Sequence, residues 1–213
     1  MREMKRLYLA SSIDRTGVDI GKDIGRDPKK LKLAFISTAA EIEEGEKKWL
    51  KDDKQGLERA GFNLFEYTIT GKTPERIKED FKDVDIIHVN GGNEYFLMQE
   101  VIKSGFDRFV NKWVDSGKIY IGSSAGSIIM GPDMGPTYTK EDIERAPELK
   151  NLKGLGIVDF VILPHWGQNH FKDFYLQYRM KHNYKPKNKL ILLNDWQFVK
   201  VEGNMYKIVD VRD

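Results

Sequence analysis

The chain contains no cysteine among its 213 residues. Disulfides, thiolate metal sites and a cysteine nucleophile are therefore excluded, and the composition fits a reducing compartment. An excess of one charge is also missing, because 35 basic side chains nearly balance 33 acidic ones and leave a formal net charge of +2. Charge therefore gives no reason to expect a nucleic acid or an anionic membrane as a partner.

Long hydrophobic runs are absent as well. Behind the charged N-terminal residues, only the run 7–10 is apolar, and it is too short for a signal peptide or a membrane span. We therefore expect a cytoplasmic protein, either a monomer or a homodimer, that binds neither membranes nor nucleic acid. No stretch has the composition of a linker, so a single domain over residues 1–213 is expected.

The chain does have a repeated alternation of strand and helix patterns. Short apolar runs such as 33–36 and 84–89 are typical of strands buried on both faces of a parallel sheet, and amphipathic stretches such as 43–60 lie between them. This alternation predicts an α/β fold with a ligand site at the carboxyl ends of the strands. Near the C-terminus, the runs 190–193, 198–201 and 206–209 predict an antiparallel end to the same sheet.

The most informative stretch is 118–130. An apolar strand pattern enters Gly122-Ser123-Ser124-Ala125-Gly126, and a second apolar run leaves it. Small residues at this point indicate a sharp turn from strand to helix, the nucleophile elbow, with Ser124 at its tip. The backbone N–H of Ala125 would then lie at a helix start and face an oxyanion. A pattern this short indicates catalysis only if the chain also supplies a base and a second oxyanion donor elsewhere.

Four histidines are candidates for the base. His88 lies in a run with the pattern of a buried strand, so we expect it in the core, hydrogen-bonded. His182 ends a lysine-rich helix pattern and is expected at the surface. His165 directly follows a strand pattern and a proline, where a catalytic residue at the sheet edge should lie. We therefore favour His165 as the base, with His170 in the adjacent polar loop as the alternative.

A second oxyanion donor is predicted before the elbow. Gly91-Gly92 follows a strand pattern, and glycine lets the backbone approach a substrate carbonyl closely. The Gly92 N–H would act together with that of Ala125, and the neighbouring Asn93 is predicted to bind substrate. An ordinary strand-to-helix turn with Asn93 as its N-cap fits the same residues equally well.

Three motifs together resemble the S51 family of serine peptidases, which includes dipeptidase E (aspartyl dipeptidase) and cyanophycinase. They are Gly91-Gly92-Asn93, Gly122-Ser123-Ser124-Ala125-Gly126 and Leu163-Pro164-His165, in this order and spacing. The resemblance covers nearly the whole chain. It implies a flavodoxin-like three-layer α/β sandwich, related to class I glutamine amidotransferases, with a mostly parallel central sheet. It also implies a Ser-His-Asp/Glu triad that uses neither metal nor cofactor.

The resemblance assigns roles to individual residues. Ser124 is the nucleophile, His165 the base, and Gly92 and Ala125 the oxyanion donors. The family's acidic residue is placed in the loop between the serine and the histidine. Matching that loop favours Asp142, and the neighbouring carboxylates Glu141 and Glu144 are the alternatives.

Substrate preference is the point at which the chain departs from the family pattern. Aspartyl dipeptidases of the family hold the acidic side chain of the substrate with arginine, on a segment after the histidine. Here the segment 168–182 contains one arginine, Arg179, which is the predicted ligand. Lysine does not replace the bidentate guanidinium, so a strict preference for aspartate is not predicted. A solvent-facing position of Arg179 is the alternative.

The sequence therefore predicts a serine peptidase of the dipeptidase E type, which hydrolyses short peptides through an acyl-enzyme on Ser124. One alternative is a carboxylesterase with the same order of serine, acid and histidine. Such enzymes place the histidine after the last strands, whereas strand patterns continue here beyond His165. Another alternative is a relative that binds a peptide without cleaving it.

Overall fold

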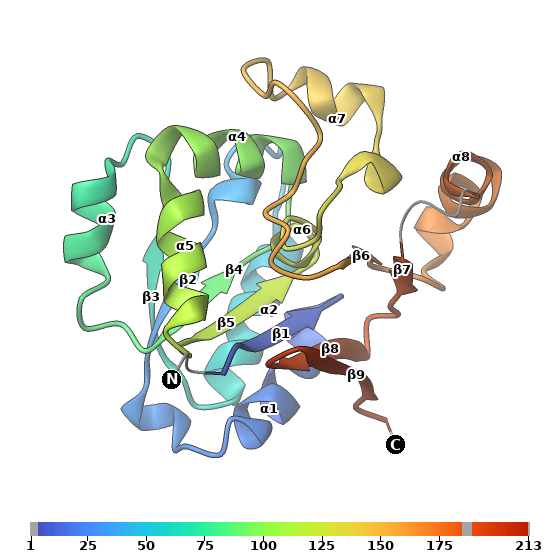
Figure 1. Ribbon diagram of the computed structural model, residues 1–213. Coiled ribbons are helices and arrows are strands. Elements are labelled where there is room, and N and C mark those ends of the chain that lie inside the picture. The colour runs from blue at the N-terminus through green and yellow to red at the C-terminus, as the bar shows by residue number, and fades with distance from the viewer. Residues whose placement is uncertain (1–3, 185–188, 213) are drawn as a thin grey trace.

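A computed structural model describes residues 4–184 and 189–212. A seven-stranded sheet with the order β3-β2-β4-β5-β1-β8-β9 lies at its centre (Figure 1). The first five strands run parallel, whereas β8 pairs antiparallel with β1, and β9 pairs antiparallel with β8. The strands of this sheet are β1 (Arg6–Ala10), β2 (Lys32–Ile36), β3 (Asn63–Tyr67), β4 (Ile86–Val89), β5 (Ile119–Ser123), β8 (Gln197–Glu202) and β9 (Met205–Asp210). The predicted α/β fold, mostly parallel with an antiparallel C-terminal part, is confirmed.

Helices cover both faces of the sheet (Figure 1). Successive side chains of a strand point to opposite faces, so Ile119 and Ile121 of β5 join the core beneath α1 and α2, while Tyr120 joins the core beneath α4 and α5. The helices are α1 (Ile13–Asp23), α2 (Lys48–Arg59), α3 (Pro74–Asp80), α4 (Glu94–Ser104), α5 (Phe106–Asp115), α6 (Ala125–Ile128), α7 (Lys140–Glu144) and α8 (Met180–Asn183). No helix in these described ranges is long and apolar enough to cross a membrane.

Shorter helical turns connect these elements. They are 3-10 turns at Pro28–Lys30, Thr38–Ala40, Gly135–Thr137 and Asn169–Phe171, and a π-helical segment at Phe174–Arg179 that leads into α8. The segment from the last 3-10 turn to α8 lies at one side of the molecule, away from α3 and α5 (Figure 1).

One strand does not join the sheet that the sequence predicts for it. Most of the run 190–193 lies in β7 (Lys189–Leu192), which pairs in parallel with β6 (Phe160–Leu163) in a separate two-stranded sheet. A continuous apolar run indicates a buried strand but contains no information on which strand lies beside it. The parallel pairing brings the carboxyl ends of β6 and β7 together. Residues that follow either strand can therefore contribute to the same site.

Candidate active site

Side chains from the carboxyl ends of several strands meet at one edge of the molecule. Ser11 follows β1, Ser124 follows β5, His165 comes two residues after β6, and Asp195 comes three residues after β7. Hydrogen bonds join all four side chains or their backbone groups. Parallel strands end at a common edge, and a ligand site at this edge is the general rule for open α/β sheets.

A sharp turn at Ser124 connects β5 to α6, as the sequence predicts. Ser124 has φ 48° and ψ −111°, a backbone conformation that non-glycine residues rarely adopt. The glycines on either side allow the turn to pack closely. A Cβ on Gly122 would lie 2.6 Å from the Gly126 carbonyl oxygen, and a Cβ on Gly126 would lie 2.0 Å from that of Val89. Any side chain at these two positions would therefore disturb the turn that presents Ser124.

A chain of hydrogen bonds runs from Ser124 through His165 to Asp195. His165 Nε2 lies 3.1 Å from Ser124 Oγ, and His165 Nδ1 lies 2.7 Å from Asp195 Oδ1. The Phe171 ring stacks on the imidazole, with 5.2 Å between ring centroids. A carboxylate at Nδ1 favours the tautomer protonated there, which leaves Nε2 as the acceptor for the serine hydroxyl proton.

The Asp195 carboxylate has two further hydrogen-bond donors. Ser11 Oγ donates to Oδ1 at 2.7 Å, and Gln168 Nε2 donates to Oδ2 at 2.5 Å. Burial alone would raise the pKa of Asp195, but the hydrogen bonds and the charge of His165 outweigh it, and the pKa lies below its ordinary value. Asp195 therefore remains ionised at neutral pH and can support a positive charge on His165.

Ser11 also holds the backbone of His165. Its side chain is fully buried, and its Oγ accepts a hydrogen bond of 2.8 Å from the His165 N–H while donating to Asp195. His165 has φ 64°, in the left-handed region that favours glycine. One hydroxyl group thus connects the carboxylate to the strained backbone of the histidine, which fixes the ring relative to both neighbours.

The loop after β4 lies directly against Ser124. A Cβ on Gly91 would be 3.2 Å from Ser124 Cβ and 3.8 Å from its Oγ. Gly92 has φ 129°, and a Cβ there would lie 2.2 Å from the Ala39 carbonyl oxygen, so no other residue fits. The loop is thus held at the position where the sequence predicts the Gly92 and Ala125 N–H groups to face an oxyanion.

A comparison with known protein families finds that the model of peptidase family S51 matches residues 19–209. The chain belongs to peptidase family S51. This membership places it among the peptidases, which are hydrolases. An uncharacterized peptidase of Listeria monocytogenes, Lmo0363, is 29% identical over 200 residues, which are 94% of this chain and 96% of the relative.

Two further similarities concern proteins called peptidase E. Peptidase E of Shewanella sp. strain ANA-3 is 34% identical over 89 residues, which are 42% of this chain and 36% of that protein. A crystal structure of a protein from Listeria monocytogenes EGD-e, provisionally named peptidase E, superposes with a TM-score of 0.87 at 28% identity. The superposition covers 97% of this chain and 98% of that one. The fold of this S51 peptidase is therefore the fold of that structure.

The acidic residue beside the histidine of this S51 peptidase is not the predicted one. Asp142 lies in α7, where its Oδ2 accepts a hydrogen bond of 2.5 Å from Thr139 Oγ1 at the N-cap of that helix. Glu141 is exposed, and Glu144 lies 3.7 Å from the Lys140 ammonium. The structure instead brings Asp195 to His165. The prediction of a carboxylate between serine and histidine is wrong because β7 ends beside β6 and delivers a residue from beyond the histidine.

Asn93 is not available to a substrate in the way the sequence analysis predicts. Its side chain is buried, and its Oδ1 accepts hydrogen bonds from the N–H groups of Tyr95 and Phe96, which makes it the N-cap of α4. Its Nδ2 donates to the backbone oxygen of Asp142. The alternative interpretation of Gly-Gly-Asn as a turn with a helix cap is therefore correct for this residue.

All four histidines lie in the described ranges, and only His165 is hydrogen-bonded to Ser124. His88 is fully buried, its Nε2 lies 3.1 Å from Asn90 Oδ1, and burial lowers its pKa to about 4. His170 and His182 are exposed. In the described part of the chain, no cluster of three or more His, Asp or Glu side chains is placed to hold a metal ion.

Arg179 is buried rather than solvent-facing, with 9% of its surface exposed. Its guanidinium lies over the rings of Phe174 and Tyr175, at 4.6 and 4.9 Å from their centroids. Among the described residues, its Nε has no hydrogen-bond partner. Burial raises the pKa of the carboxyl group of Glu94, and the positive charge of Arg179 opposes that rise. The two buried side chains therefore interact electrostatically. A buried cation therefore lies near the site, and its contact with a substrate remains a prediction.

Asp195, Ser11 and Gln168 are the residues that sequence reasoning missed. The signal for Asp195 was present, since it follows the apolar run 190–193 as His165 follows the run 160–163. The rule that site residues follow parallel strands applies to both runs. Ser11 follows the first strand in the same way, after Ala10.

Proposed function

We propose that this chain is a serine peptidase of the dipeptidase E type, which hydrolyses short peptides through an acyl-enzyme on Ser124. The observation that supports it most directly is the hydrogen-bonded chain from Ser124 Oγ through the His165 ring to the Asp195 carboxylate. This arrangement has the parts of a catalytic triad: a nucleophile, a base within hydrogen-bonding distance, and an acid that orients the base.

In the first half of the reaction, Ser124 Oγ attacks the carbonyl carbon of the peptide bond, and His165 Nε2 takes the hydroxyl proton. The resulting oxyanion is stabilised by the Ala125 and Gly92 N–H groups, and the imidazolium is stabilised by Asp195. The carbon–nitrogen bond then breaks as His165 transfers its proton to the departing amine. The N-terminal part of the substrate remains as an ester on Ser124.

In the second half, water replaces the departed amine. His165 takes a proton from the water, whose oxygen attacks the ester carbonyl, and the same two N–H groups stabilise the second oxyanion. Breakage of the carbon–oxygen bond returns the proton from His165 to Ser124 Oγ. The products are a free carboxylic acid and the amine released earlier, and the enzyme returns to its starting state.

Labelling with a fluorophosphonate probe tests the nucleophile. The probe is expected to modify wild type on Ser124, and Ser124→Ala should abolish both labelling and the hydrolysis of dipeptides. Ser123→Ala is the matched control, because this neighbouring hydroxyl is buried and accepts a hydrogen bond from the Ile13 N–H. Persistent labelling of Ser124→Ala would contradict the proposal.

A substrate panel separates the alternatives. A peptidase is expected to cleave some dipeptides with a rate that depends on Ser124. Hydrolysis of simple esters together with no cleavage of any peptide would favour a carboxylesterase. Binding of peptides without labelling or turnover would favour a non-catalytic relative.

A further inference from the structure

A pocket of about 290 Å³ opens beside the strand end that presents His165. Its lining comes entirely from residues 166–176, which directly follow that histidine. Pockets for small molecules usually measure about 300 to 1,000 Å³, so this one has room for a single amino-acid residue rather than a long peptide.

Aromatic and aliphatic side chains form much of its wall. The rings of Trp166 and Tyr175 meet edge to face, with 5.3 Å between centroids, and the Tyr175 hydroxyl donates a hydrogen bond to the Pro164 carbonyl oxygen. Trp166 and Leu176 remain 37% and 51% exposed despite their size. The pocket therefore offers apolar surface that is fixed in place but not covered, which suits a large apolar group.

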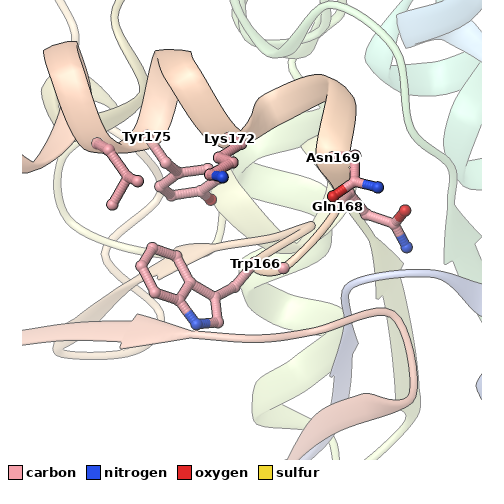
Figure 2. Close-up of a pocket in the computed structure, with 7 residues that line it drawn as sticks. Trp166, Gln168, Asn169, Lys172 and Tyr175 are labelled. Atoms are coloured by element: carbon pink, nitrogen blue, oxygen red, sulfur yellow. The ribbon is translucent and has the colours of Figure 1, made fainter.

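One cationic side chain lines this apolar surface. Figure 2 shows Trp166 on one side of the pocket and Lys172 with Tyr175 on the other, while Asn169 and Gln168 lie at one end. Within residues 4–184 and 189–212, the Lys172 ammonium is in no ion pair or side-chain hydrogen bond. A cation beside an apolar wall is complementary to a ligand that combines a carboxylate with an apolar group.

The pocket is coupled to the reacting groups through two of its residues. Trp166 is the residue next to His165, and Gln168 donates a hydrogen bond to Asp195. In the proposed reaction His165 delivers a proton to the departing amine, so the residue that leaves must lie on the histidine side of Ser124. The pocket residues, which lie within 166–176, directly follow the histidine that delivers this proton.

We infer that this pocket binds the C-terminal residue of a short peptide substrate, with a large apolar side chain against Trp166 and the free α-carboxylate paired with Lys172. The assignment to the leaving side rests on the proposed function. A site that requires a free carboxylate on the residue after the scissile bond would limit hydrolysis to substrates whose chain ends at that residue. The pocket would thus provide the exopeptidase specificity of the enzyme.

Binding to the Ser124→Ala protein tests the pocket separately from catalysis. The probes are the dipeptide Asp-Phe and its C-terminal amide, with titration calorimetry as the measurement. The free acid is expected to bind roughly tenfold more tightly than the amide, as for one hydrogen bond to a charged group. Lys172→Met in the same background should remove this difference, whereas Lys181→Met, an exposed lysine of α8 outside the pocket, should preserve it.

A second binding measurement tests the apolar wall of the pocket. Trp166→Ala should weaken the binding of Asp-Phe more than that of Asp-Ala, because only the larger side chain reaches the indole. Three results would overturn the inference. The free acid and the amide could bind equally well, the two lysine variants could have equal effects, or no probe could bind. Labelling of Ser124 in wild type is a separate result, so a protein that is labelled but ignores the carboxylate contradicts the pocket and not the proposed function.

Discussion

The sheet edge around Ser124 and the segment 166–184 are built differently, although both border the same histidine. At the sheet edge, Ser11 is fully buried, and Gly122 and Gly126 leave no room for a side chain. The segment 166–184 has short 3-10, π-helical and α-helical pieces, with several large side chains exposed, among them Trp166 and Leu176. The first region is close-packed, whereas the second exposes much of its surface to solvent and buries only some side chains, such as Tyr175 and Arg179.

We relate this difference in packing to two tasks, proton transfer and the selection of a substrate. Groups that transfer protons must be held to within a fraction of an ångström, which requires rigid strand ends with buried hydrogen bonds. Groups that select a substrate need accessible surface, and a segment outside the main sheet can vary without disturbing the strands. We therefore expect changes at the sheet edge to lower the rate for all substrates, and changes in the segment 166–184 to alter the choice among them.

The largest effect is expected for Asp195→Asn. The amide cannot hold His165 in the required tautomer or stabilise its positive charge, so kcat should fall by roughly 10⁴-fold on every substrate. Steady-state kinetics on the best dipeptide of the panel would measure this.

Asp142→Asn is the matched control. This carboxylate binds Thr139 at the cap of α7, and its replacement should change kcat less than about twofold, with a small loss of stability at the cap. A large loss of kcat in Asp142→Asn together with an active Asp195→Asn would show that the close-packed edge does not supply the acid.

The two carboxylates also show how far the sequence determines the site. The placement of Ser124 and His165 at one edge was predictable because each follows a strand pattern within a local motif, and the glycines beside Ser124 have a local steric reason. Asp195 follows a strand pattern too, which makes it a candidate, but the choice of Asp195 over the loop carboxylates depends on β7 pairing with β6. That pairing is a contact between runs separated by the segment 164–188, and hydrophobic periodicity contains no information about it. The same limit applies to Ser11, whose role appears only when β1 is placed beside the later strands.

An intermediate effect is expected for Ser11→Ala. The change removes one donor to Asp195 and leaves the His165 N–H without its acceptor, so the ring would be less well held. We expect kcat to fall by roughly 10- to 100-fold with little change in KM, since Ser11 orients the catalytic groups and does not touch the substrate.

Ser104→Ala distinguishes this role from a general loss of packing. Ser104 is a buried serine in α4 that donates a hydrogen bond to the Glu100 carbonyl oxygen, and it lies outside the site. Its replacement should leave kcat unchanged at a temperature where both variants are folded. Similar kinetics of the two alanine variants would mean that Ser11 only contributes to stability.

The smallest and most selective effect is expected at Arg179, a buried residue of the segment 166–184. If its guanidinium holds an acidic substrate side chain, Arg179→Met should lower kcat/KM for Asp-Xaa dipeptides by roughly tenfold relative to neutral ones. Arg179→Lys should recover little of this preference, because lysine lacks the planar pair of donors. Glu94 offers a competing explanation, since Arg179 could serve only to balance that buried carboxylate. In that case both variants would lower the stability of the protein, and they would lower the rates on acidic and neutral dipeptides by the same factor. Arg179 would then have no part in the choice of substrate.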